Sequence, residues 1–162
     1  MQKLKFWLFI LVLLLAQFLW MPRLSLLGIY PDLIFIMVIM FLALRGEWPA
    51  GLVAIGFGLL QDFQVSNNFL HVLLLLLMVL VGGWLRHNLV GDEAGAALLL
   101  VIILSPLYVL LFWCTRALFF GASFAFFPML GAALIFCLWN IAASALLYPW
   151  FTRWSEEALL GS

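Results

Sequence analysis

Long apolar runs alternate with short clusters of charged residues, proline and glycine along the whole chain. Within each run the apolar residues follow one another without the every-second-residue alternation of a membrane β-strand, so the runs predict helices. We expect six helices, at residues 6–21, 33–44, 50–61, 69–85, 94–115 and 127–150. Pro106 predicts a kink in the fifth helix, and Pro149 lies near the expected end of the sixth.

The second and third runs are shorter than the others, with 12 residues each. A helix of that length measures about 18 Å, whereas the hydrocarbon core of a bilayer is about 30 Å thick. The two segments can cross as short spans if flanking residues join the helices, or they can form a re-entrant hairpin that the other helices shield from lipid. We expect two short spans.

The composition places these helices in a membrane. Of the 162 residues, 69% are hydrophobic and 9% are charged, against about 45–50% and about 25% in soluble proteins. The sequence therefore predicts an all-α integral membrane protein, folded as a compact bundle of six transmembrane helices. We expect a single polytopic membrane domain over residues 1–162.

The charges and the cysteines exclude several other classes of protein. Seven Lys and Arg residues balance seven Asp and Glu residues, which leaves no basic surface for nucleic acid. Cys114 and Cys137 both lie inside apolar runs, where cysteine packs as a small hydrophobic residue. We expect no metal and no other cofactor.

The distribution of Lys and Arg predicts the orientation, because cytoplasmic loops hold the excess of positive charge. Two of these residues, Arg23 and Arg116, fall on the side opposite the N-terminus. The other five fall on the side of the N-terminus: Lys3, Lys5, Arg45, Arg86 and Arg153. Both termini are therefore expected in the cytoplasm of a multi-pass membrane protein.

The ends of the second helix carry two candidate residues, Asp32 and Arg45. Pro31 and Asp32 are typical of a helix start, because a carboxylate there accepts from free N–H groups and complements the helix dipole. Arg45 begins a tight turn, in which it can pair with Glu47 or with a lipid phosphate. We expect it to anchor the helix end at the membrane surface.

Small residues recur every four positions in the third run, at Ala50, Ala54 and Gly58, and Gly51 and Gly56 widen the smooth surface. Such a pattern lets another helix backbone approach closely. It predicts a packing face, either inside the bundle or toward a partner, without identifying the neighbour.

Asp62 and Asn140 are the most informative polar residues. Asp62 follows eleven nearly unbroken apolar or glycine residues, and a carboxylate at that depth must be paired or functional. We expect a structural hydrogen bond or an interfacial position, with a partner contact or proton or substrate handling as alternatives, and His71 as a candidate partner. Asn140 lies in the middle of the sixth helix, where we expect it to bond another helix, with a role at a functional interface as the alternative.

The polar residues within the runs do not assemble a known catalytic set. They contain no Ser/His/Asp combination, no HExxH motif and no paired carboxylates in one motif. We therefore expect a protein that is not an enzyme.

The order of these residues resembles the MreD family of rod-shape-determining membrane proteins. The resemblance covers nearly the whole chain and rests on the lysines of the first helix and on later motifs, which are Pro31-Asp32, the apolar run to Arg45, Gly51, Gly56-Phe57-Gly58-Leu59-Leu60, Asp62, Asn140 and Leu147-Tyr148-Pro149. It implies a bacterial inner-membrane protein, without known catalytic activity, that takes part in lateral cell-wall synthesis. The partners it implies are an MreC-like protein, the MreB cytoskeleton, and a RodA-type glycosyltransferase with its transpeptidase, in addition to membrane lipid.

MreD-like proteins are distantly similar in fold to the S-components of energy-coupling-factor transporters, which bind vitamins in the membrane. This similarity supplies the main alternative, a substrate-binding membrane subunit of a vitamin-type transporter. The first helix contains Ala16 as its only small residue in LVLLLAQFLW, and so lacks the small-residue coupling motif expected of such a subunit. We therefore expect a non-catalytic scaffold or regulator of cell-wall elongation.

Overall fold

The computed structural model describes residues 2–65, 69–88, 93–121 and 125–160. Over these residues the fold consists of six α-helices and a short 3-10 helix, which are α1 (Gln2–Leu19), η1 (Met21–Leu24), α2 (Leu33–Arg45), α3 (Glu47–Val65), α4 (Leu70–Asn88), α5 (Glu93–Phe120) and α6 (Phe126–Leu160). The predicted all-α class is confirmed. Three helices are long and apolar enough to cross a membrane, at Leu70–Asn88, Ala94–Phe120 and Phe126–Arg153, which is the pattern of a multi-pass membrane protein.

The second helix is short, as predicted, but the prediction of a short third helix is wrong. Helix α2 has 13 residues, whereas α3 has 19, or about 28 Å. Glu47 and Pro49 lie in the first turn of α3, where an acidic residue and proline are both favourable. The helix also continues past Gln61 and Asp62 because both side chains are buried and hydrogen-bonded within the protein.

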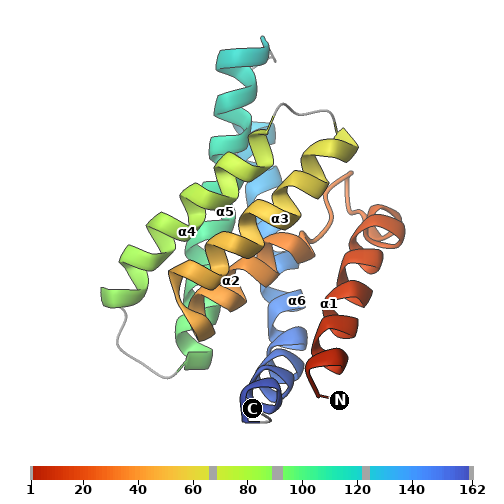
Figure 1. Ribbon diagram of the computed structural model, residues 1–162. Coiled ribbons are helices and arrows are strands. Elements are labelled where there is room, and N and C mark those ends of the chain that lie inside the picture. Colours follow the sequence, from red (N-terminus) through yellow and green to blue (C-terminus); the bar gives the residue numbers. More distant parts are fainter. Residues whose placement is uncertain (1, 66–68, 89–92, 122–124, 161–162) are drawn as a thin grey trace.

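Helix α2 lies in the interior of the bundle and contacts all five other α-helices. Ten of its 13 residues are buried, namely Leu33–Met40, Leu42 and Ala43. A helix that is apolar on every side lies either in a protein interior or against lipid, and the burial of α2 places it in the interior. In Figure 1, α2 lies behind α3 and begins well below the upper ends of α3 and α5.

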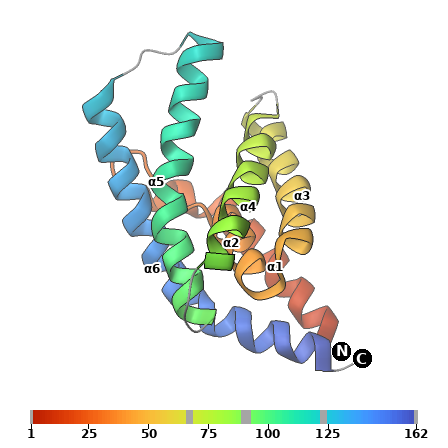
Figure 2. The same ribbon diagram turned by 90° about the vertical axis from the view of Figure 1, so that its left-hand side faces the viewer.

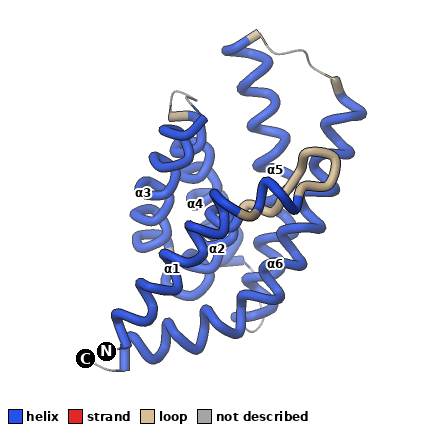
Figure 3. Tube along the Cα trace, turned by 90° about the vertical axis from the view of Figure 1, so that its right-hand side faces the viewer, coloured by secondary structure: helices blue, strands red, loops and turns tan. Residues whose placement is uncertain are grey.

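The connections between helices gather at two ends of the molecule. Both termini, the turn between α2 and α3, the end of α4 and the start of α5 lie toward one end (Figure 1). The end of α3 and the end of α5 lie toward the opposite end. Toward that end the α3–α4 pair diverges from the α5–α6 pair, as the two side views in Figures 2 and 3 show.

Helix α6 continues beyond Pro149 to Leu160, so the expected end of the sixth helix near residue 150 is wrong. Its last turns bend toward the start of α1 (Figures 2 and 3). Phe151 is buried there, with its ring centroid 6.0 Å from that of Phe6, 5.9 Å from Phe9 and 5.5 Å from Phe41. The contacts of this ring stabilise the helix after the proline.

Candidate functional site

The start of α2 is capped by its own N-cap residue. Asp32 has an extended backbone, and its Oδ1 accepts hydrogen bonds from the backbone N–H groups of Ile34 and Phe35, both at 3.0 Å. The predicted helix start at Asp32 is confirmed. The first N–H groups of a helix have no partner within the helix, and away from water they require one from elsewhere.

Two other helices supply the remaining acceptors at this helix start. Gln17 of α1 accepts the N–H of Leu33 through Oε1 at 2.7 Å. Asn140 of α6 accepts the N–H of Asp32 through Oδ1 at 3.0 Å. Every backbone N–H from residue 32 to residue 35 therefore donates to a side-chain oxygen, and the predicted bond of Asn140 to another helix is confirmed.

Helices α3 and α5 join the same group of side chains. Gln61 of α3 donates from Nε2 to both carboxylate oxygens of Asp32, each at 3.1 Å. Asn140 donates from Nδ2 to Oγ of Ser105 in α5 at 3.3 Å. We call Gln17, Asp32, Gln61, Ser105 and Asn140 the Asp32 network. All five residues are buried, and through them α2 is tied to α1, α3, α5 and α6.

Asp62, the neighbour of Gln61, caps a different helix. Its carboxylate accepts from the backbone N–H groups of His71 at 2.9 Å and Val72 at 3.0 Å, at the start of α4. The Nδ1 of the His71 ring lies 2.9 Å from the same carboxylate. Of the roles expected for Asp62, the structural hydrogen bond is the one observed, with His71 as partner.

Gly58, one turn before Asp62, lets α3 and α4 approach closely. A β-carbon added at Gly58 would lie 2.9 Å from the Cα of Val72, which is closer than real β-carbons come to backbone. Ala50 and Ala54 are fully buried on the same helix. These three residues form a packing face inside the bundle, as the four-residue spacing predicts.

The remaining predicted residues lie apart from the Asp32 network. Arg45 is at the other end of α2. Gly56 is exposed, and nothing lies within 4 Å of a β-carbon added there, so its predicted contact with a partner stays a prediction. Glu47, considered as a partner for Arg45, has its Oε1 3.4 Å from Nε2 of His87.

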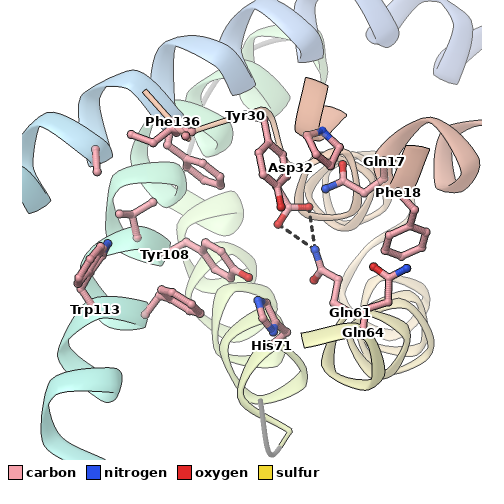
Figure 4. A pocket seen from close by; sticks show the side chains of 16 residues that line it. Gln17, Phe18, Tyr30, Asp32, Gln61, Gln64, His71, Tyr108, Trp113 and Phe136 are labelled. Carbon is pink, nitrogen blue, oxygen red and sulfur yellow. Dashed lines mark hydrogen bonds between the residues drawn. The ribbon is translucent and has the colours of Figure 1, made fainter. Parts of the chain in front are cut away.

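A cavity of about 280 Å³ lies beside the Asp32 network (Figure 4). Helices α1, α3, α4, α5 and α6 and the segment before α2 all contribute to its wall. Aromatic rings form much of the wall, among them Phe18, Tyr30, Phe112, Trp113 and Phe136. Two buried polar atoms at this wall, Oε1 of Gln61 and the hydroxyl of Tyr108, have no hydrogen-bond partner among the residues that the structure describes.

Sequence reasoning did not single out Gln17, Gln61, Ser105 or Tyr108 as site residues. Gln17 carries a signal, because it is the first polar residue after a long apolar run. Gln61 and Ser105 are polar residues of ordinary type, and Tyr108 resembles any core aromatic. Within the described ranges, no three His, Cys, Asp or Glu residues lie close enough to hold a metal ion.

Comparison of the chain with protein-family models, with curated proteins and with solved structures finds no match.

Proposed function

We propose that this protein is a non-catalytic scaffold of the MreD type in the bacterial inner membrane. In this role all six α-helices lie in the membrane, and both termini lie in the cytoplasm. The partners are a single-span MreC-like protein, a RodA-type glycosyltransferase with its transpeptidase, and, directly or through them, the MreB cytoskeleton.

The observation that carries the proposal is the placement of the residues on which the resemblance rests. Asp32 and Asn140 bond to each other across the bundle, while Gly58 and Asp62 both contact the start of α4. Contacts at these four residues therefore hold helices together. In a protein family without a shared reaction, the residues expected to recur are those that hold the helix bundle together.

The outer face of α3 and α4 is suited to a partner helix. A shallow groove of about 330 Å³ runs between these helices, with Gly51, Leu52, Ile55, Leu76, Val79 and Leu80 along it. A β-carbon added at Gly51 would meet nothing within 4 Å. Because apolar helices gain little from leaving lipid, close packing at small residues is what favours their association.

The positions of the cations support the proposed orientation. Arg45 ends α2 and Arg86 lies in the last turn of α4, and these helix ends lie toward the termini in Figure 1. The excess of Lys and Arg at this end supports a cytoplasmic location for it. The cavity then lies toward the outer side of the membrane.

The test is purification of the tagged full-length chain from its native membranes in a mild detergent, with mass spectrometry of the proteins that accompany it. We expect a single-span protein with a coiled coil, together with cell-wall synthases. Gly51→Leu fills the groove and should reduce recovery of the single-span protein at least about tenfold. Gly131→Leu is the matched control, because Gly131 of α6 is also open to its surroundings but lies outside the groove. Equal recovery with both variants would exclude the groove as the partner site.

A second candidate function is a substrate-binding membrane subunit of a vitamin-type transporter. The cavity favours it, because ligand sites are concave, mostly apolar and lined by a few converging polar groups. The same purification separates the two functions. Recovery of paired ATPases with a membrane coupling subunit, or of a stoichiometric vitamin, would make the transporter the better assignment and the scaffold wrong.

A further inference from the structure

The two unpartnered polar atoms at the cavity wall are held in fixed directions. The Nε2 of Gln61 donates to both oxygens of Asp32, and a carboxylate can only accept, so the amide must face Asp32 with its nitrogen. Its Oε1 is therefore turned away from Asp32, and in Figure 4 the Gln61 amide lies between Asp32 and His71 at the cavity. Gln61 is 7% exposed, and this oxygen is a buried acceptor that receives no hydrogen bond from any described residue.

Tyr108 supplies the second fixed group. Its ring stacks on Phe136 with centroids 6.0 Å apart and planes 15° apart, and its centroid lies 5.2 Å from that of Phe35. The ring is thus held from two sides, and its hydroxyl points across the cavity toward His71 and Gln61 (Figure 4). Tyr108 is 5% exposed. A buried hydroxyl without a partner is unfavourable unless something else bonds to it.

His71 adds a third polar group to the same part of the wall. Because its Nδ1 faces the Asp62 carboxylate at 2.9 Å, Nδ1 carries the hydrogen. In the neutral ring Nε2 is then an acceptor. The ring itself is held against Phe112, with centroids 5.5 Å apart. Gln61 and His71 therefore offer acceptors, while the Tyr108 hydroxyl can donate or accept.

The charge of the wall limits what can enter. No Lys or Arg is among the described residues that line the cavity, and Asp32 is its only acidic residue. The Asp32 carboxylate is already bonded to two backbone N–H groups and to Gln61, and it lies at the positive end of the α2 dipole. An anion such as a phosphate or a carboxylate would meet the Asp32 carboxylate and no Lys or Arg side chain among the described lining residues, so the wall favours an uncharged molecule.

We propose that this cavity is a binding site for a small, flat, uncharged ring molecule that carries at least one N–H or O–H donor. The donor bonds to Oε1 of Gln61, the Tyr108 hydroxyl bonds to an acceptor of the ligand, and the ring lies among the aromatic side chains. A volume of about 280 Å³ is just below the range of about 300–1,000 Å³ that holds drug-sized ligands, so the ligand is small. The scaffold function assigns no such site, whereas the transporter function would place its substrate in this same cavity.

Two probes of nearly equal shape test the proposal, with binding measured by calorimetry and by saturation-transfer NMR on the full-length protein in detergent. The first probe is 7-azaindole, a flat two-ring molecule with one N–H donor and one ring-nitrogen acceptor. Indene has the same two-ring shape but neither group. We expect saturable binding of 7-azaindole with a Kd of about 1 mM or tighter, and binding of indene at least about tenfold weaker.

Tyr108→Phe is the decisive variant, because the tyrosine hydroxyl makes no hydrogen bond to any described residue and its loss should leave the Tm unchanged or higher. It should weaken 7-azaindole at least about fivefold and leave indene unchanged. Trp139→Phe is the matched control, since Nε1 of Trp139 is also buried without a described hydrogen-bond partner, but Trp139 does not line the cavity. This control should bind both probes like the unaltered protein. Ala132→Phe, which places a ring in the cavity wall, should abolish binding of both probes.

Two results would overturn the proposal. One is the absence of saturable 7-azaindole binding up to about 10 mM. The other is equal binding of both probes that does not respond to Tyr108→Phe, which would show an apolar cavity suited to lipid chains. Neither result bears on the scaffold function, because partner recovery is tested at Gly51, on a surface that does not line the cavity.

Discussion

The backbone N–H of Asp32 donates to Oδ1 of Asn140 across 3.0 Å, although the two residues are 108 positions apart in the chain. This bond joins the first turn of the innermost helix to the middle of the last helix. Asn140 also donates to Ser105, so one amide holds α2, α5 and α6 in a fixed relation. In a protein whose helices gain little by hiding apolar surface from lipid, such bonds help to define the register of the bundle.

Replacing Asn140 with Leu should destabilise the protein by about 1–3 kcal/mol, because the buried N–H of Asp32 loses its acceptor. Unfolding by sodium dodecyl sulfate, followed by circular dichroism, measures the change in free energy. Asn88→Ala is the matched control, since Asn88 is an exposed residue at the end of α4 whose side chain donates to the carbonyl of Trp84 in its own helix. A loss at Asn140 no larger than the loss at Asn88 would show that the cross-bundle bond contributes nothing.

Asp62→Asn and Asp62→Leu should differ in stability. Asparagine retains a side-chain oxygen that can accept from the N–H groups of His71 or Val72, whereas leucine leaves both donors without a partner. We expect Asp62→Leu to be less stable than Asp62→Asn by about 2 kcal/mol, measured by the same unfolding experiment. In a bacterial strain that depends on this gene for rod shape, retained shape and partner recovery with both variants would exclude a role for an ionised carboxylate.

Gly58 and Gly56 provide a matched pair on one helix. Gly58→Ala places a methyl group 2.9 Å from the Cα of Val72, and because backbone cannot move aside freely we expect a loss of about 1–3 kcal/mol. Gly56→Ala meets open space, so it should stabilise α3 by about 0.5–1 kcal/mol through its better helix propensity. Thermal unfolding in detergent separates the two. A stabilising Gly58→Ala would mean that α3 and α4 are farther apart than described.

Much of the fold can be predicted from the sequence because apolar runs, prolines and N-cap residues act locally. The positions of Asp32 at a helix start and of Asn140 against another helix both follow from such rules. The burial of α2 does not follow from such rules, because a side chain has the same hydropathy whether it faces lipid or protein. The length of α3 does not follow from the sequence either, since Gln61 and Asp62 resemble the polar edge of a membrane until their internal partners are known.

The cavity could not be predicted at all. It depends on how the ring of Tyr108 and the amide of Gln61 are turned, and these directions are set by Phe35, Phe136 and Asp32 on other helices. No local pattern distinguishes a tyrosine whose hydroxyl lacks a partner from one that is fully bonded. Sites of this kind follow from the tertiary arrangement and not from spacing along the chain.

The part of α6 beyond Pro149 provides a last prediction. Phe151 is 2% exposed and its ring meets three other phenylalanine rings, from α1 and α2, whereas its neighbour Trp150 is 51% exposed. Phe151→Ala should therefore destabilise the bundle by about 2–4 kcal/mol by leaving a cavity, and Trp150→Ala should cost less than about 1 kcal/mol. The comparison is made by denaturant unfolding. Equal and small losses would mean that the last turns of α6 detach from α1, and the bundle would then end at the proline, where the sequence alone had placed it.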